Sequence, residues 1–141
     1  MKKITFLTVS LLVLAAFILS ACSASSILSD TSWKLVSFGQ ANNPTAAGTE
    51  PNPMITFDKD SKVSGSVGCN SLSGSFKVSG DKLVFGPIAT TMMACDEKLM
   101  LQESTVLQVL GETAKFKLED NKLTITSNTG DMVAIFEKVE P

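Results

Sequence analysis

Short segments of alternating apolar and polar residues fill most of the chain after residue 33, and they constrain its fold more than any other feature. Residues 73–79 alternate in this way, and the turn Gly80-Asp81 joins them to residues 82–85. A two-residue turn between alternating segments is typical of a β-hairpin. A second turn, Glu119-Asp120-Asn121, separates two further segments. Because alternate side chains of a strand face the same side, the pattern predicts a sheet of short antiparallel strands.

Residues 96–112 break this alternation and predict a single helix. Apolar side chains recur there at helical spacing; they are Leu99, Val106, Leu107 and Leu110, with Met100 close to the same face. Asp96 is a suitable N-cap, and Gly111 is a suitable C-terminal glycine. One amphipathic helix beside many strands predicts an α+β fold in which the sheet dominates. Met92, Met93 and Met100 are expected in the core, with an apolar surface for a partner as the alternative.

The N-terminus has the order of a secretory signal peptide. Lys2 and Lys3 precede an apolar run over residues 4–18, and Leu19-Ser20-Ala21-Cys22 follows. These four residues resemble a bacterial lipobox, which implies a signal peptide over residues 1–21 and lipid attachment at Cys22. Two or more acyl chains on one cysteine anchor a protein stably. The alternative is an uncleaved transmembrane anchor, for which the apolar run is short.

After the signal peptide, residues 22–32 are expected to be the lipidated cysteine and a short tether. The ordered domain is expected from Trp33 to Lys138. Within it, residues 39–53 contain Gly, Pro and Asn with few apolar side chains, which predicts a long exposed loop.

The composition excludes several functions. The chain has no His and no Arg, and so lacks the usual general base and the guanidinium fork that binds phosphates. Its formal net charge is −2, and removing Lys2 and Lys3 leaves 10 Lys against 14 acidic residues, a balance of −4. A nucleic-acid surface needs clustered positive charge, so no nucleic-acid partner is expected. We expect no catalytic residue, no metal site and no cofactor.

Two blocks of the chain carry a family resemblance. They are "VSGSVGCNSLSGSF" and "LVFGPIATTMMAC", followed by Glu103 in the expected helix. Together they resemble the META domain family of HslJ-like bacterial lipoproteins, over residues 33–138. The resemblance implies one compact, antiparallel, barrel-like β domain with the helix packed across it. Relatives often carry a basic or bulky residue after Cys-Asn and an Arg before Met-x-Cys. This chain has the small Ser71 at the first place and the uncharged residues 90–93 at the second.

Besides Cys22, the chain has Cys69 and Cys95, for which four roles are possible. A thiol nucleophile at Cys69 needs a neighbouring base, and the chain has no His. Two thiolates alone do not complete a tetrahedral zinc site. If Cys22 carries lipid, Cys69 and Cys95 remain in an exported chain, where a disulfide is favoured. Two free buried thiols are the alternative.

Glu103 and Asn70 are the candidate binding residues. Glu103 lies four residues after Leu99 and three before Val106, so its carboxylate is expected along the apolar stripe of the helix. A carboxylate in that position needs hydrogen-bond partners. It either bonds to strand backbone or to Asn70 in a structural role, or it contributes to a binding site. Asn70 is expected to be structural because asparagine stabilises turns.

The resemblance implies a protein without an established catalytic activity, linked to heat stress, antibiotic tolerance or virulence. We therefore expect a non-catalytic, monomeric envelope lipoprotein that is held on a membrane by its N-terminal lipid and binds an envelope protein. The alternative is a carrier of a lipid or a small apolar ligand, like the lipoproteins that pilot secretins. In a Gram-negative cell the expected location is the periplasmic face of the outer membrane, and in a Gram-positive cell it is the cell surface. A hydrolase is a third hypothesis, but no catalytic triad is recognisable.

Overall fold

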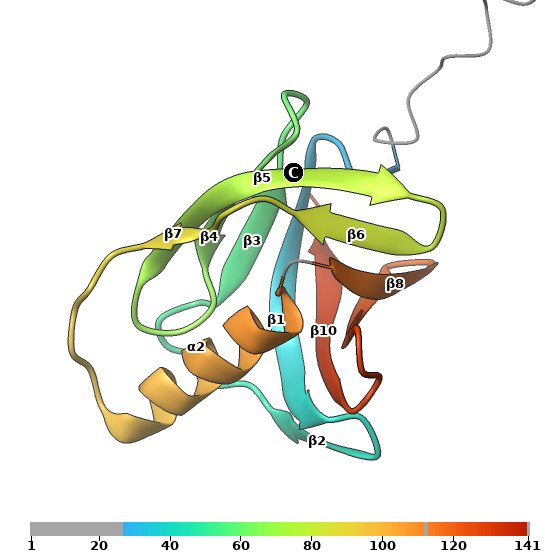
Figure 1. Cartoon of the computed structure of the whole chain (residues 1–141). Helices are drawn as coiled ribbons and strands as arrows, with labels where there is room; N and C mark the ends of the chain where they lie inside the picture. The colour runs from blue at the N-terminus through green and yellow to red at the C-terminus, as the bar shows by residue number, and fades with distance from the viewer. Residues whose placement is uncertain (1–26, 112, 141) are drawn as a thin grey trace, which may run out of the picture.

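The computed structural model describes residues 27–111 and 113–140, and these form a closed antiparallel β-barrel with one helix packed against it (Figure 1). The elements in chain order are β1 (Thr31–Gln40), β2 (Asn43–Ala46), β3 (Met54–Phe57), β4 (Lys62–Ser66), β5 (Ser71–Ser79), β6 (Lys82–Phe85), β7 (Ala89–Thr90), α2 (Glu97–Val109), β8 (Thr113–Glu119), β9 (Lys122–Ser127) and β10 (Met132–Val139). The order around the barrel is β1-β10-β9-β8-β6-β5-β4-β3, and β3 pairs with β1 to close it. The expected α+β, barrel-like fold is therefore confirmed.

The two turns singled out in the sequence connect neighbouring strands. Gly80-Asp81 joins β5 to β6, and Gly80 has φ +63°, a backbone conformation that glycine adopts without strain. Asp120-Asn121 joins β8 to β9. Both hairpins could be predicted because a two-residue turn fixes the register of the strands that it joins.

Alternate residues of the strands fill the barrel. The largest fully buried side chains are Trp33, Phe57 and Phe136. Phe57 meets Phe76 edge to face, with ring centroids 4.7 Å apart. Side chains thus occupy the interior, as in other small barrels.

Strand β1 is long because its two halves have different neighbours. One edge pairs with β10 over most of its length, whereas the other pairs first with β3 and then with β2. Residues 39–53 were expected to be one long loop, but they include the end of β1 and all of β2, so this prediction is wrong. Every residue of β2 is exposed, and the strand therefore lacks the apolar alternation that would reveal it.

The ordered domain begins before Trp33. Leu28 is fully buried in the core, and β1 starts at Thr31, so residues 28–32 are part of the fold and not of a tether. Thr31 Oγ1 donates to the carbonyl of Leu28 and accepts a 2.7 Å bond from Trp33 Nε1. The expected signal peptide, residues 1–21, and the expected lipidation site, Cys22, lie outside the described residues. Within the described ranges, no helix has the length and hydropathy needed to cross a membrane.

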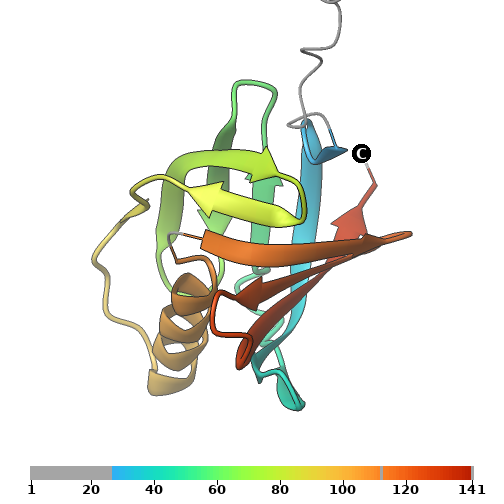
Figure 2. The same cartoon turned by 45° about the vertical axis from the view of Figure 1, so that its right-hand side comes forward.

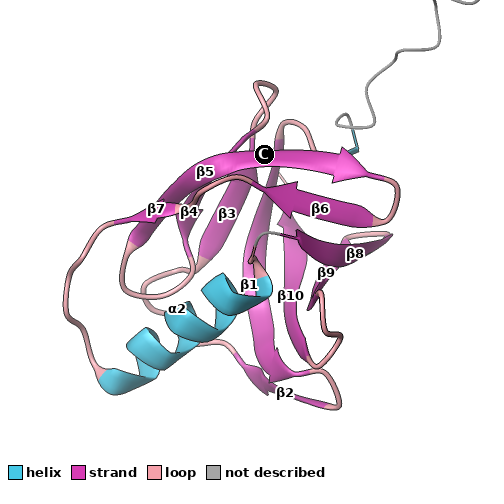
Figure 3. Ribbon diagram, viewed as in Figure 1, coloured by secondary structure: helices cyan, strands magenta, loops and turns pink. Residues whose placement is uncertain are grey.

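Helix α2 lies across one end of the barrel, on the side of β1, β9 and β10 (Figure 2 and Figure 3). Its N-cap is Asp96, whose carboxylate accepts bonds from the backbone of Lys98 and Leu99, both 3.1 Å, as expected. Its buried face is rotated relative to the prediction. Val106 and Leu110 are buried, but Leu99 and Leu107 are only half-buried, and Gln102, Glu103 and Val109 complete the buried face.

Candidate functional site

The helix approaches the segment between β4 and β5 through Gly68. A Cβ atom at this position would lie 2.6 Å from Glu103 Cβ and 2.7 Å from the carbonyl oxygen of Leu99. No side chain fits there, so Gly68 allows the backbone of the segment to contact the helix directly. This contact places Glu103 beside Asn70.

Glu103 and Asn70 form a buried, fully paired unit. The backbone N–H of Asn70 donates to Glu103 Oε2, and Asn70 Nδ2 donates to Glu103 Oε1 at 2.8 Å. Glu103 is 7% exposed and Asn70 is 4% exposed. The structural alternative for Glu103, a bond to Asn70, is the arrangement found.

The other side of Asn70 holds a segment that precedes the helix, residues 91–96, which we call the strap. Asn70 Oδ1 accepts from the backbone N–H of Met93 at 2.7 Å and from Thr91 Oγ1 at 2.9 Å. Cys69 and Cys95 form a disulfide with their Cα atoms 5.9 Å apart. Cys69 is buried and Cys95 exposed. The bonds of Asn70 and the disulfide therefore fasten the strap to the turn before β5.

Gln102 is a structural residue that the sequence did not reveal. Its Nε2 donates to the carbonyl of Val67, and its Oε1 accepts from the backbone N–H of Gly48, both at 2.8 Å. It joins the helix to two segments that are far apart in the chain. Glutamine is common on exposed helix faces, so nothing local marks this one as buried.

The chemistry of this cluster is structural. Among the described residues, no buried side-chain nitrogen or oxygen lacks a hydrogen-bond partner, and no group of three His, Cys, Asp or Glu residues could hold a metal ion. Asn70 and Glu103 use their polar atoms on each other and on the strap. The arrangement fixes the position of the helix and of the strap.

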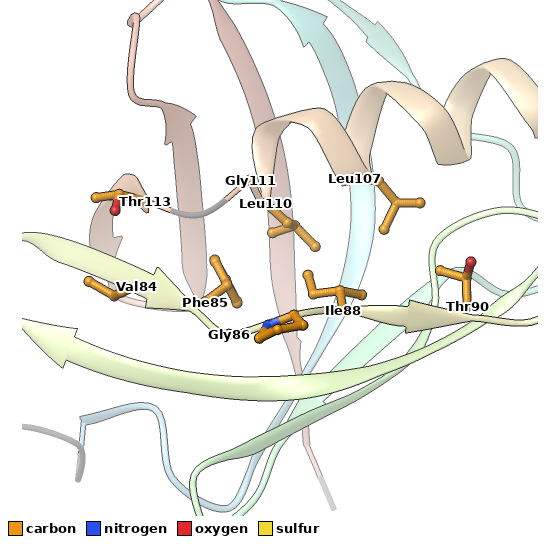
Figure 4. Close-up of a pocket in the computed structure, with 10 residues that line it drawn as sticks. Val84, Phe85, Gly86, Ile88, Thr90, Leu107, Leu110, Gly111 and Thr113 are labelled. Carbon is orange, nitrogen blue, oxygen red and sulfur yellow. The ribbon is translucent and has the colours of Figure 1, made fainter.

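A groove of about 690 Å³ lies between the C-terminal half of α2 and the segment that runs from β6 to β7 (Figure 4). Its lining residues are Val84, Phe85, Gly86, Pro87, Ile88, Thr90, Leu107, Leu110, Gly111 and Thr113. None of them is charged. Ile88 points toward the helix and Leu107 points back toward β7 (Figure 4), so the groove has apolar walls on both sides.

The methionines were expected in the core, and this prediction is wrong. Met92 is 96% exposed, Met93 56% and Met100 39%. Met92 follows closely after Thr90 of the groove, and Met100 lies seven residues before Leu107, on the same flank of the helix. Met92, Met93 and Met100, which we call the methionine rim, are thus exposed apolar side chains on the strap that follows the groove in sequence and on the helix.

Two carboxylates, at hairpins of β8–β10, have shifted pKa values. The hydroxyl of Thr129 and then that of Ser127 donate to Asp131 and lower its pKa. A hydrogen bond and the positive charge of Lys117, whose Nζ lies 2.8 Å from the carboxylate, lower the pKa of Glu119. The bonds of Asp131 lie within the turn between β9 and β10, whereas the ion pair of Glu119 lies on the exposed surface of β8.

Comparison with known proteins identifies the family. The META domain profile matches residues 26–140. The chain belongs to the META domain family. Over 76 residues it is 34% identical to Heat shock protein HslJ of Escherichia coli (strain K12), covering 53% of this chain and 54% of that relative. The chain therefore spans about half the length of this curated relative.

Solved structures share the fold of this META domain. The NMR structure of a protein from Burkholderia xenovorans superposes with a TM-score of 0.69 at 24% identity, covering 84% of this chain and 88% of the other. A second NMR structure superposes with a TM-score of 0.62 at 27% identity, covering 77% and 90% of the two chains. The first of these likenesses establishes the fold alone.

Proposed function

We propose that this META domain is a non-catalytic, lipid-anchored protein of the bacterial cell envelope that binds another protein. The observation that carries the proposal is the contrast between a polar cluster whose groups are all paired and an apolar surface that is exposed. The polar side chains at the Gly68 contact bond to one another and to backbone, whereas the groove and the methionine rim leave apolar surface uncovered. Exposed, contiguous apolar surface is typical of interaction sites. The META family is not a known enzyme family.

The anchor rests on the sequence Leu19-Ser20-Ala21-Cys22. Acylated Cys22 would place the barrel on a membrane, outside the cytoplasm. Ser23 follows the cysteine in place of an aspartate that would favour retention in the inner membrane. In a Gram-negative host we propose the periplasmic face of the outer membrane, and in a Gram-positive host the cell surface.

A role in envelope stress is supported by the likeness to a relative named Heat shock protein HslJ. We propose that the protein acts when heat or antibiotics damage the envelope. A deletion strain should lose viability under these conditions and recover with the parent gene. A deletion strain that survives both stresses as well as the parent would overturn this part of the proposal.

Fractionation tests the anchor. The parent protein should sediment with membranes and carry the mass of its acyl chains, whereas Cys22→Ser should stay soluble and lack that mass. Ser23→Ala is the matched control because it leaves the acceptor cysteine in place. Equal membrane association of parent and Cys22→Ser, with no difference in acyl mass, would refute lipidation at Cys22.

A second candidate function is the carriage of a lipid or a small apolar ligand. The groove between the helix and the strands favours this function. Side chains fill the interior of the barrel, so a ligand would bind in the groove. Organic extraction of protein purified from its own envelope distinguishes the two functions. A stoichiometric lipid in the extract supports the carrier, and its absence supports the protein-binding function.

A further inference from the structure

We propose that the groove binds an extended, uncharged segment of a partner protein, which adds as a strand to the free edge of β7 at Thr90. This inference rests on the proposed function, because it names the site and the kind of partner. It follows from the backbone of one edge, from the chemistry of the groove, and from the position of the chain's N-terminal end.

Strand β7 has one paired edge and one free edge. Ala89 pairs with Ser73 of β5, and Thr91 N–H, directly after β7, donates to Ser71 at 3.1 Å, so these residues face β5. In an antiparallel strand, the residue between two such residues directs its N–H and C=O groups to the opposite edge. Thr90 therefore presents a backbone donor and acceptor away from β5.

No strand covers this edge in residues 27–111 and 113–140. β8 pairs with β6 only from Lys82 to Val84, and β7 pairs only with β5. Beyond Val84 the barrel wall is continued by helix α2, which cannot pair with a strand edge because its backbone bonds are internal. An extended peptide satisfies such an edge with its own backbone, and its alternate side chains enter neighbouring pockets.

The groove favours apolar, uncharged side chains. Ile88, Leu107 and Leu110 supply its walls, and none of the lining residues is charged. The methionine rim adds exposed apolar side chains on the strap and on the helix, and methionine adapts to partners of different shape. An alternating segment of β-branched and small polar residues fits both the free edge and these walls.

The position of the N-terminal end favours a protein as the occupant over the anchoring membrane. Cys22 precedes Ile27 by five residues, which span at most about 18 Å. The first described residues lie at the end of the barrel opposite α2, as the two views show (Figure 1 and Figure 2). A membrane that holds Cys22 therefore lies near the end opposite the helix, and the helix side faces the aqueous compartment.

The test uses a defined probe, the peptide acetyl-Thr-Val-Thr-Ile-Thr-Val-Thr-amide. Its control has the same side chains, with the alternate backbone nitrogens of one edge methylated. The protein is the mature chain with Cys22→Ser, because residues 27–140 contain the closed barrel and its core. Amide shifts of Ile88, Thr90 and Leu107 are followed by ¹⁵N NMR. The unmethylated peptide should shift them saturably below about 1 mM, and methylation should weaken binding at least about 10-fold.

Variants of Thr90 test the edge from the protein's side. Thr90→Pro removes an N–H that does not bond to β5, so the barrel should stay folded while peptide binding weakens about 10-fold or more. Thr90→Ala keeps this N–H and should change binding less than about threefold. The ¹⁵N spectrum of each variant reports its fold independently of the peptide.

Three results would overturn the inference. They are the absence of shifts at Ile88, Thr90 and Leu107 up to 1 mM peptide, equal binding of the methylated peptide, and displacement of the peptide by dodecanoate bound at the same residues. The third result would assign the groove to a small apolar ligand. The anchor is tested separately by fractionation, so an anchored protein that binds no peptide overturns only the strand addition.

Discussion

Replacing Glu103 by glutamine tests the buried unit that joins helix and strap. Both carboxylate oxygens accept from Asn70, one from its backbone N–H and one from its side-chain amide. Gln offers one oxygen and one NH₂ group, so one donor of Asn70 would face another donor. The Asn70 amide cannot rotate to correct this, because its Oδ1 already accepts from Met93 and Thr91.

The magnitude follows from the loss of one hydrogen bond to a charged acceptor at a buried site. Such a loss lowers the free energy of unfolding by about 1.5–3 kcal/mol. In urea this is a midpoint shift of roughly 1–2 M for a domain of this size. Glu50→Gln is the control, because Glu50 is exposed and a surface change of this kind stays within about 0.5 kcal/mol.

The assay is equilibrium denaturation of parent, Glu103→Gln and Glu50→Gln without reductant, so that the disulfide is constant. A midpoint for Glu103→Gln equal to that of Glu50→Gln would refute the reasoning. It would mean that the carboxylate is solvated and that the helix is not held at Asn70.

Three further outcomes are expected. Protein taken from its own envelope and alkylated without reductant should show no free thiol at Cys69 or Cys95, and full alkylation of both would contradict the disulfide. Reduction should lower the free energy of unfolding by up to about 3.5 kcal/mol, because the disulfide joins residues 26 positions apart. Gly68→Ala should lower the free energy of unfolding by about 1–3 kcal/mol, because the new Cβ lies 2.6 Å from Glu103 Cβ, and an unchanged urea midpoint would contradict this. Gly80→Ala gives the cost of backbone strain without a clash, because Gly80 has φ +63° and no atom lies within 4 Å of a Cβ there. Thr129 and Ser127 lower the folded-state pKa of Asp131, so the stabilisation from its ionised form is present above the unfolded pKa of about 3.9 and is lost as pH falls through the folded pKa. The difference in urea midpoint between parent and Asp131→Asn should therefore be larger at pH 7 than at pH 2. A difference independent of pH would show that ionised Asp131 does not stabilise the turn.

The sequence by itself determined the local features of this protein. The turn at Gly80, the N-cap at Asp96 and the end of the helix near Gly111 follow from backbone preferences of single residues and from bonds to their near neighbours. The alternation in residues 73–79 likewise predicted a strand, and its Phe76 and Val78 are buried because each strand has one side in the core. These features depend on residues a few positions apart, and they can therefore be predicted from short stretches of the sequence.

Features that depend on distant segments were decided only by the tertiary structure. Barrel closure pairs β1 with β10, and β2 forms because the second half of β1 has an edge for it; neither needs a local apolar pattern. The same holds for Gln102, which is buried because Val67 and Gly48 present backbone groups to it.

The candidate site divides in the same way. The sequence marked Cys69, Cys95, Asn70 and Glu103 as unusual, and the fold brought them together, because Gly68 allows the helix to contact the turn. Met100 was misplaced because helical spacing alone does not fix which side of a helix faces the core, and Met92 and Met93 were misplaced because they lie in the exposed strap before the helix. The groove arises where β8 leaves β6 and the helix begins to cover the barrel. Its position is set by the path of the backbone between elements, and no single stretch of sequence encodes it.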